Sequence, residues 1–202
     1  LLLAFVSTSE NIQNLEAIRQ NHLRRTGMET GPVDPALDRS IVWLSFGVHG
    51  NEAGASESSM QVLYDLATGN LESEEQLKNT IVIIDPAINP DGYDRYTHWY
   101  RRVAPTTPDP DYTGWEHQEP WPGGRVNHYL FDLNRDWAWS TQVETQQRLI
   151  QYGNWLPHIH ADFHEQYPNE PYYFAPAAEP FHHHITDWQR ELQTRIGFNH
   201  AN

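Results

Sequence analysis

Residues 41–48, IVWLSFGV, form an almost unbroken apolar run, and residues 81–86, IVIIDP, form a second. Strands that are apolar along their whole length are typical of a sheet that is covered on both faces. We expect two further strands at residues 1–7 and 158–163. The two apolar runs therefore predict the buried centre of a mostly parallel sheet.

Helical patterns lie between these strands. Apolar side chains recur at helical intervals in residues 10–25 and 55–66, and residues 143–156 are a third helix candidate. Strands and helices in alternation predict the α/β class. We expect a three-layer α/β/α sandwich around a mixed, mostly parallel sheet that is truncated on its C-terminal side. Two capping-box spacings predict helix starts, at Thr141 with Glu144 and at Thr186 with Gln189.

The composition excludes several classes of function. The 202 residues include 13 Lys and Arg against 27 Asp and Glu, a net charge of −14, which disfavours nucleic acid as a partner. No apolar run approaches the ~20 residues of a membrane-spanning helix. Because the chain has no Cys, thiol nucleophiles and iron–sulfur clusters are excluded. The 12 His residues leave His with carboxylate as the metal chemistry open to this chain.

The length predicts one domain, of which residues 1–202 form the N-terminal and central part. The absence of an initial Met and the abrupt end at Asn202 suggest a piece of a longer chain. We interpret residues 1–6 as a strand and not as the end of a signal peptide, because they have no basic flank and no small-residue cleavage site.

Residues 93–130 interrupt the alternation of strands and helices. They contain five Pro, the pair Gly123 and Gly124, and three Trp, without convincing periodicity. A loop of this length inside a domain is usually functional or disordered, and its Trp content argues against disorder. We therefore expect an ordered loop that helps to form a pocket.

The first candidate metal ligands are His49 and Glu52, which directly follow the apolar run 41–48. Two ligands three residues apart can share one ion, and ligands of α/β sheets bind beyond the carboxyl ends of strands. The pair alone is equally compatible with a solvated His and a Glu that is favourable at a helix N-terminus.

A second cluster lies on the strand expected at residues 158–163. His158, His160, Asp162 and His164 share one face if the strand is regular. They could form a polar network or face water at a sheet edge. Alternatively, His164 completes a zinc site with the earlier pair, since catalytic zinc sites combine two near ligands with a distant one.

Two further motifs follow other elements. Residues 131–137, FDLNRDW, precede a predicted helix, and Arg135 is suited to binding a carboxylate with its forked guanidinium. Pairing of Arg135 with Asp132 or Asp136 is the structural alternative. Residues 89–92, NPDG, are fully explained as a turn.

In this order the four motifs GVHGNE, NPDG, DLNRDW and DFHEQ resemble the zinc carboxypeptidase family, the carboxypeptidase A-like metallocarboxypeptidases. The resemblance covers about residues 40–166. It implies that His49, Glu52 and His164 hold one zinc ion. It also implies that Asp132 orients the first His ligand from behind.

The resemblance further implies a substrate site for the C-terminus of a peptide or protein. Asn134 and Arg135 match the pair that binds the terminal carboxylate. Arg125, nine residues before Asn134, matches the arginine that stabilises the oxyanion, and Arg102 is its rival. The expected function is hydrolysis of C-terminal peptide bonds, in a secreted or periplasmic protein as is common in the family.

One catalytic group of the family is not matched here. The general base, a Glu on a late strand, and the substrate-capping Tyr are expected beyond Asn202, so these residues alone should be nearly inactive. Glu165 is a poor substitute, because it should leave the strand on the face opposite to His164. Two rival functions are an amidohydrolase of the succinylglutamate desuccinylase or aspartoacylase type and a non-catalytic peptide or glycan binder.

Two other features are interpreted without a function. His182, His183 and His184 could bind metal as a short His tract, but they precede a predicted helix and are expected in a solvated loop. The aromatic residues 172–174 are expected to pack in the core or a loop.

Overall fold

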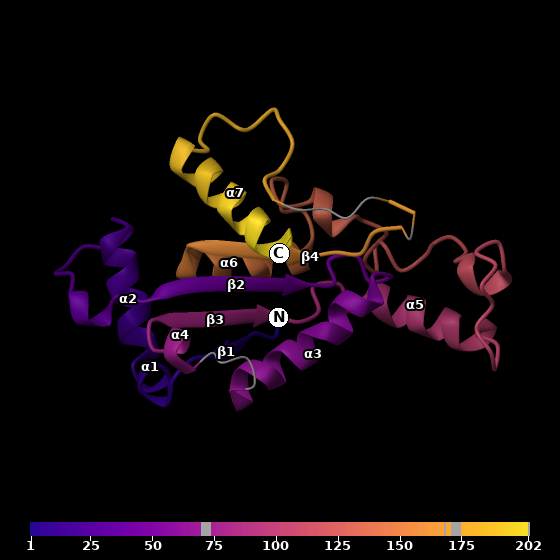
Figure 1. Ribbon diagram of the computed structural model, residues 1–202, viewed down its shortest axis with the longest axis horizontal. Helices are drawn as coiled ribbons and strands as arrows, with labels where there is room; N and C mark the ends of the chain where they lie inside the picture. Colours follow the sequence, from indigo (N-terminus) through magenta and orange to yellow (C-terminus); the bar gives the residue numbers. More distant parts are fainter. Residues whose placement is uncertain (70–73, 168, 171–174, 202) are drawn as a thin grey trace. The chain divides into compact units, whose positions relative to one another are not determined.

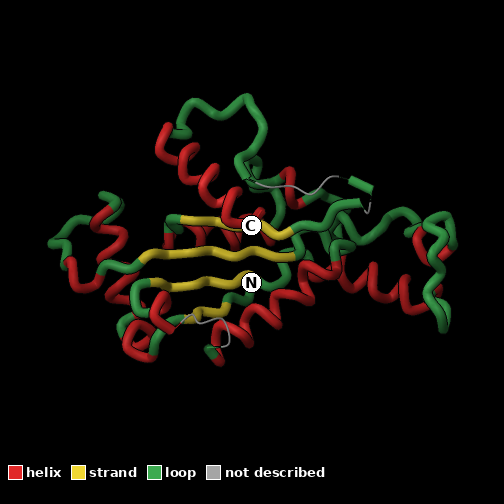
Figure 2. The backbone as a smooth tube through the Cα atoms, in the orientation of Figure 1, coloured by secondary structure: helices red, strands yellow, loops and turns green. Residues whose placement is uncertain are grey.

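The computed structural model describes residues 1–69, 74–167, 169–170 and 175–201, so the aromatic residues 172–174 lie outside the described part. Four strands form one sheet in the order β1-β3-β2-β4 (Figure 2). β2 is parallel to both β3 and β4, whereas β1 is antiparallel to β3. The predicted mixed, mostly parallel sheet is confirmed, with strands β1 (Ala4–Val6), β2 (Ser40–Phe46), β3 (Thr80–Asp85) and β4 (Ile159–Phe163).

Helices cover both faces of this sheet, as the two apolar strands predict (Figure 1). On one face, α2 (Leu15–Arg25) and α6 (Val143–Trp155) bury Ile18 and Trp155 against Trp43. On the other face, α3 (Ala53–Thr68) packs against the cluster around Phe46 and Ile84. Burial of each large apolar side chain contributes about 1.5–3 kcal/mol, so the core depends on both helix layers.

Three local predictions are wrong or incomplete. The helix expected over 10–25 is broken at Asn14 into α1 (Ser9–Gln13) and α2. Thr141 does not cap α6: Gln142 is the N-cap residue, and the Thr141 hydroxyl donates to Asp136 at 2.6 Å. Asp136 also accepts from the backbone N–H groups of Thr141 and Gln142. The alternative pairing of Arg135 with Asp136 is not formed among the described residues.

The segment after β3 also differs from the prediction. Residues 89–92 are not a free turn but the start of α5 (Pro90–Val103), with Asn89 as N-cap and its Oδ1 accepting from Gly92 N at 2.9 Å. The helix takes up the first part of the predicted loop 93–130. The remainder of that loop contains a short 3-10 helix, η2 (Trp115–His117), and a second one, η3 (Leu133–Arg135), follows the loop.

The chain divides into two compact units, Leu1–Glu165 and Gln166–Asn202, and the expectation of a single domain stays a prediction. The second unit contains α7 (Asp187–Ala201). Its predicted capping box is confirmed, since Thr186 N donates to Gln189 Oε1 at 2.8 Å and Gln189 N donates to Thr186 Oγ1 at 3.3 Å. In the described part of the chain, no helix combines the length and apolarity needed to cross a bilayer.

Candidate metal centre

The three predicted metal ligands come from two neighbouring strands and one helix start. His49 lies just beyond β2, Glu52 immediately precedes α3, and His164 directly follows β4. β2 and β4 are parallel neighbours, so their carboxyl ends lie at the same edge of the sheet. This topology brings His164 next to a pair that is more than a hundred residues earlier.

The ligand atoms of the three side chains converge. One nitrogen of each imidazole and a carboxylate oxygen all lie within 4.8 Å of one another. His49 Nδ1 lies 2.8 Å from Glu52 Oε1, and His164 Nδ1 lies 2.9 Å from Glu52 Oε2. His49 is buried, at 3% exposure, while His164 remains partly open to solvent. The cluster therefore has one closed side and one accessible side.

Electrostatics bind the cluster together. Burial raises the pKa of Glu52, but hydrogen bonds from His164 and His49 outweigh it and lower the pKa to about 2. The bonds that His164 makes to Asp162 and Glu52 raise its pKa to about 10. The donor set is thus an ionised carboxylate with two imidazole nitrogens facing it, which is the His₂Glu set that zinc accepts.

Asp132 lies behind His49, where the resemblance expects it. Its Oδ1 is 3.2 Å from His49 Nε2 and accepts from Asn134 N at 2.9 Å. Its Oδ2 pairs with Arg125 Nη2 at 2.9 Å. Burial raises the pKa of Asp132, and the charges of His49 and Arg125 reverse this to give a lowered pKa. Asp132 therefore links the first imidazole to Arg125 and to the start of η3.

The candidate substrate residues are not placed equally. Arg125 Nη1 lies 3.5 Å from His49 Nδ1, and its side chain is 47% exposed. Arg102 is in the last turn of α5, where its Nε donates to the carbonyl of His98 in the same helix. Twelve residues of helix separate Arg102 from the start of α5, about 18 Å at 1.5 Å per residue. The geometry thus favours Arg125 over Arg102 as the arginine beside the cluster.

Asn134 and Arg135 lie on η3, directly after Asp132. Arg135 is exposed, and its Nη1 donates to the carbonyl of Asn134 at 3.2 Å. Its guanidinium forms no ion pair among the described residues. The turn therefore places both residues directly after Asp132, and the exposed guanidinium of Arg135 is open to an anion.

Contacts that the sequence did not reveal hold Arg125 in place. Asn89 Nδ2 donates to the carbonyl of Arg125 at 3.2 Å. Arg95, one turn into α5, donates to the carbonyls of Gly123 at 2.7 Å and Asn127 at 3.1 Å. An Arg in a helix carries no sequence signal for such a role. The loop that carries Arg125 is thus fixed to the N-terminal half of α5.

Glu165 caps the N-terminus of α3. Its carboxylate accepts from Gly54 N at 2.6 Å and from Ala55 N at 3.3 Å, at the N-terminus of α3. Glu52 makes no capping bond to α3, because its carboxylate faces the imidazoles. Glu165 therefore satisfies the helix N-terminus that Glu52 leaves open.

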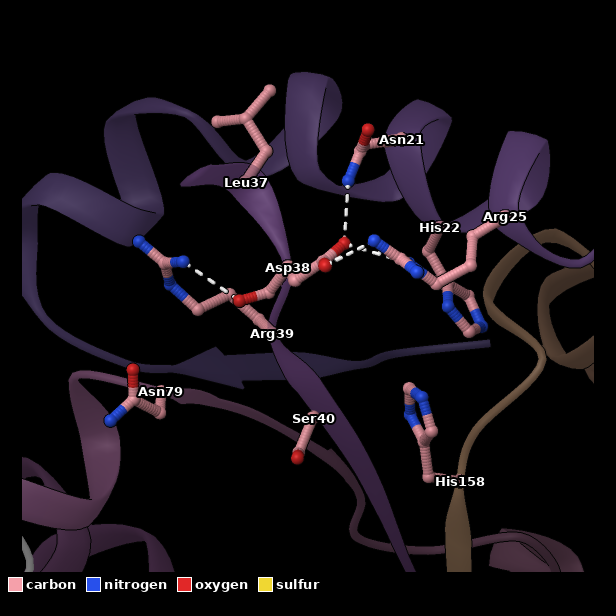
Figure 3. Close-up of a pocket in the computed structure, with 9 residues that line it drawn as sticks. All are labelled: Asn21, His22, Arg25, Leu37, Asp38, Arg39, Ser40, Asn79 and His158. Atoms are coloured by element: carbon pink, nitrogen blue, oxygen red, sulfur yellow. Dashed lines mark hydrogen bonds and ion pairs between the residues drawn. The ribbon is translucent and has the colours of Figure 1, made fainter. Parts of the chain in front are cut away.

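Two other groups could be mistaken for the site. His182, His183 and His184 are exposed, and one nitrogen of each lies within 4.8 Å of the others. A polar cavity of about 310 Å³ lies at the amino ends of β2 and β4, the sheet edge opposite to the cluster (Figure 3). There Asp38 already pairs with Arg25 and accepts from Asn21 at 3.0 Å. The two imidazoles of this cavity are engaged by the backbone: His22 Nε2 lies 2.9 Å from the carbonyl of Leu156, and His158 Nδ1 accepts from Ile41 N at 3.0 Å.

Comparisons with known proteins agree with the geometry. The family profile described as zinc carboxypeptidase matches residues 12–197. The chain is 26% identical over 132 residues to Probable carboxypeptidase 2 of Trichophyton verrucosum (strain HKI 0517), which covers 65% of this chain and 20% of that protein. It is 27% identical over 131 residues to Carboxypeptidase 2 of Trichophyton tonsurans, covering 65% of this chain and 19% of that protein. The chain thus spans about a fifth of these relatives. It belongs to the zinc carboxypeptidase family.

Proposed function

We propose that this protein is a zinc-dependent carboxypeptidase that removes residues from the C-terminus of peptides or proteins. One observation carries the proposal: the ligand atoms of His49, Glu52 and His164 lie within 4.8 Å of one another, beside Arg125 and the η3 turn. Family membership and the names of the relatives support the same reaction class.

The residues fit a zinc ion by the chemistry of their donors. Both imidazoles turn Nδ1 toward Glu52 and Nε2 toward another carboxylate, so each ring is held in the orientation of a metal ligand. A zinc ion held there would supply Lewis-acid chemistry, activating water and polarising the scissile carbonyl.

Arg125 acts on the charge that develops during hydrolysis. Its guanidinium is half exposed and anchored on one side by Asp132, which leaves donors free to face a substrate carbonyl. Donors of this kind contribute about 3–4 kcal/mol when the oxyanion forms. The ion pair with Asp132 fixes the guanidinium of Arg125, so its N–H donors are oriented before the substrate binds.

Asn134 and Arg135 select the end of the chain. A guanidinium and a neutral amide together recognise a carboxylate by charge and by hydrogen bonds. Since η3 is tied to the cluster through Asp132, a bound carboxylate would lie at a fixed distance from the metal ligands. This fixed spacing restricts cleavage to the last peptide bond.

The test compares substrates of the full-length protein by mass spectrometry of the released products. We expect zinc-dependent loss of the terminal residue from a peptide with a free C-terminus, and no cleavage of the same peptide with an amidated end. Arg135→Ala should raise KM at least tenfold, whereas Arg19→Ala, which breaks only a surface pair with Glu16, should not change it. Unchanged cleavage of the amidated peptide contradicts an exopeptidase. Preferential hydrolysis of an acyl amino acid would instead support the amidohydrolase reaction. Peptide binding without hydrolysis would support a non-catalytic binding function.

A further inference from the structure

The two imidazoles of the metal centre are held in matching ways. Each directs Nδ1 at one oxygen of Glu52 and Nε2 at a separate carboxylate. For His49 this second carboxylate is Asp132, and for His164 it is Asp162, whose Oδ2 lies 3.1 Å from His164 Nε2. The family resemblance explains the first of these carboxylates. The resemblance gives no role to the second, Asp162.

Asp162 is itself held by a chain of hydrogen bonds. Ser45 Oγ donates to Asp162 Oδ1 at 3.1 Å and lies 2.7 Å from His160 Nε2. Because the serine proton goes to the carboxylate, His160 must donate through Nε2, and its Nδ1 is left to accept from Tyr152 at 3.4 Å. Burial lowers the pKa of His160, in agreement with a neutral ring. Along this series of hydrogen bonds, from Tyr152 through His160 and Ser45, each donor thus points toward Asp162.

The register of the sheet places Asp162 in a polar row. Ser45 pairs with Asp85 on β3 and with Asp162 on β4, so the three residues lie side by side across parallel strands. Two residues earlier, the same face of the sheet is apolar, at Trp43 and Ile83. The sheet face therefore changes from apolar to charged at the row next to the metal centre.

Arg148 of α6 is the cation that faces this row. It is fully buried, and its Cζ lies 4.1 Å from the centre of the Trp137 ring. Burial lowers the pKa of Arg148, and the charges of Asp85 and Asp162 oppose this. Its guanidinium nitrogens have no hydrogen-bond partner among the described residues, so its contribution is electrostatic. The guanidinium therefore attracts the carboxylate of Asp162 from behind the row.

We propose that Asp162 is the positioning residue for His164. Its carboxylate accepts a hydrogen bond from His164 Nε2 and so holds the ring with Nδ1 facing the metal site. Ser45 and Arg148 keep the carboxylate in place. This proposal rests on the proposed zinc function. It assigns the buried polar row of the sheet to the metal centre and gives the second imidazole a support equal to that of the first.

The test measures the zinc dissociation constant of the chain by competition with a chromogenic chelator. Carboxylates behind His ligands typically change metal affinity 10–100-fold. Asp162→Ala should therefore weaken zinc binding about 10–100-fold, and Asp162→Asn should weaken it less, since the amide oxygen can still accept a hydrogen bond from His164 Nε2. Asp85→Asn is the matched control, because Asp85 lies in the same row and near Arg148 but does not contact His164. It should leave the dissociation constant unchanged.

A milder pair of variants covers the case in which the Asp162 variants do not fold. Ser45→Ala removes the hydroxyl that holds Asp162 and should weaken zinc binding severalfold. Ser59→Ala removes an equally buried hydroxyl that donates within its own helix, at 2.6 Å to Ser56, and should have no effect.

A spectroscopic readout separates positioning from general stability. In the zinc-loaded chain, nitrogen-15 NMR should detect a slowly exchanging proton on His164 Nε2, and Asp162→Ala should lose it while the proton on His49 Nε2 persists. Equal zinc affinity in the chain and in Asp162→Ala, with the Nε2 proton retained, overturns the proposal and leaves the zinc function intact. Failure of the unaltered chain to bind zinc overturns the proposed function itself.

Discussion

At the scale of single residues, Asp85 is a buried carboxyl group without hydrogen-bonding support. Its two carboxylate oxygens are buried and have no hydrogen-bond partner in the described part of the chain. Burial raises its pKa to about 7, although the charge of Arg148 opposes this and that of Asp162 adds to it. An ionised Asp85 therefore costs folding free energy at neutral pH.

This predicts a pH dependence with a definite sign. Between the ordinary pKa of 3.8 and about 7, the folded state holds a proton that the unfolded state has lost, so the free energy of unfolding falls as pH rises through this window. The full rise in the pKa of Asp85 corresponds to roughly 4 kcal/mol in the free energy of unfolding. Asp85→Asn cannot ionise, so the stability of the unaltered chain relative to this variant should fall by a few kcal/mol from pH 4 to pH 8. Urea unfolding at these pH values measures the difference, and a constant difference contradicts the prediction.

The site residues were predictable from the sequence only where a motif carried them. The resemblance to the zinc carboxypeptidases pointed to His49, Glu52 and His164 through two short motifs at the ends of expected strands, and the structure brings their ligand atoms within 4.8 Å of one another. Arg148 did not, because an Arg at a helix position that faces the core has the same sequence pattern as a solvated one. Its place beside the carboxylates of Asp85 and Asp162 is visible only in the folded structure, where both charges act on its guanidinium.

At the scale of elements, three glycines allow three segments to meet at the metal centre. A methyl group on Gly50 would overlap the backbone of Gly92 and Tyr93 at the start of α5. A methyl group on Gly92 would overlap the carbonyl of Gly124, next to Arg125. The close approach of these backbones therefore depends on the absence of side chains.

Gly50→Ala should separate α5 from the turn between His49 and Glu52. We expect a loss of about 1–3 kcal/mol in the free energy of unfolding, as is typical of overpacking, together with weaker zinc binding. Gly153→Ala is the control: nothing lies within 4 Å of its added methyl in α6, so the substitution should stabilise the protein by about 0.5–1 kcal/mol. Urea unfolding distinguishes the two, and equal effects contradict this account.

Asn89 gives a second prediction for the same elements. It is 1% exposed, caps α5 through Oδ1 and donates through Nδ2 to the carbonyl of Arg125. Asn89→Ala should cost about 2 kcal/mol, since it removes a cap and leaves buried groups unpaired. Thr8→Ala removes the cap of the short helix α1 and should cost about 1 kcal/mol or less. A larger loss for Thr8→Ala than for Asn89→Ala in thermal unfolding contradicts the assigned roles.

The strands were easier to predict than the caps. Runs of buried β-branched residues specify β2 and β3 through local pattern alone. The residues 89–92 favour a turn as strongly as a helix start, and the choice between them depends on contacts with Gly50 and Gly124, which are distant in the sequence.

At the scale of the whole molecule, a bound zinc ion is expected to raise the free energy of unfolding. Its ligands follow β2 and β4 and precede α3, so binding requires the folded first unit. Zinc at a hundred times its dissociation constant should raise the free energy of unfolding by about 2.7 kcal/mol. The same zinc concentration should not stabilise His164→Ala, and thermal unfolding with and without a chelator tests this. Equal stabilisation of both proteins contradicts a ligand role for His164.

The overall architecture could be predicted because alternation of strands and helices leaves few topologies. The pairing of β4 beside β2 could not, because no local pattern states which strands are neighbours. That pairing is what brings His164 to Glu52 and Asp162 to Ser45. The candidate metal centre therefore depends on the order of the strands as much as on the motifs.

The most direct test of this account is the zinc content of the dialysed protein, measured by elemental analysis together with two sets of variants. We predict one zinc ion per chain, retained when His182, His183 and His184 are all replaced by Ala, and lost in His49→Ala, Glu52→Ala and His164→Ala. Zinc that persists in those three single variants but disappears with the exposed triple His would contradict the central claim.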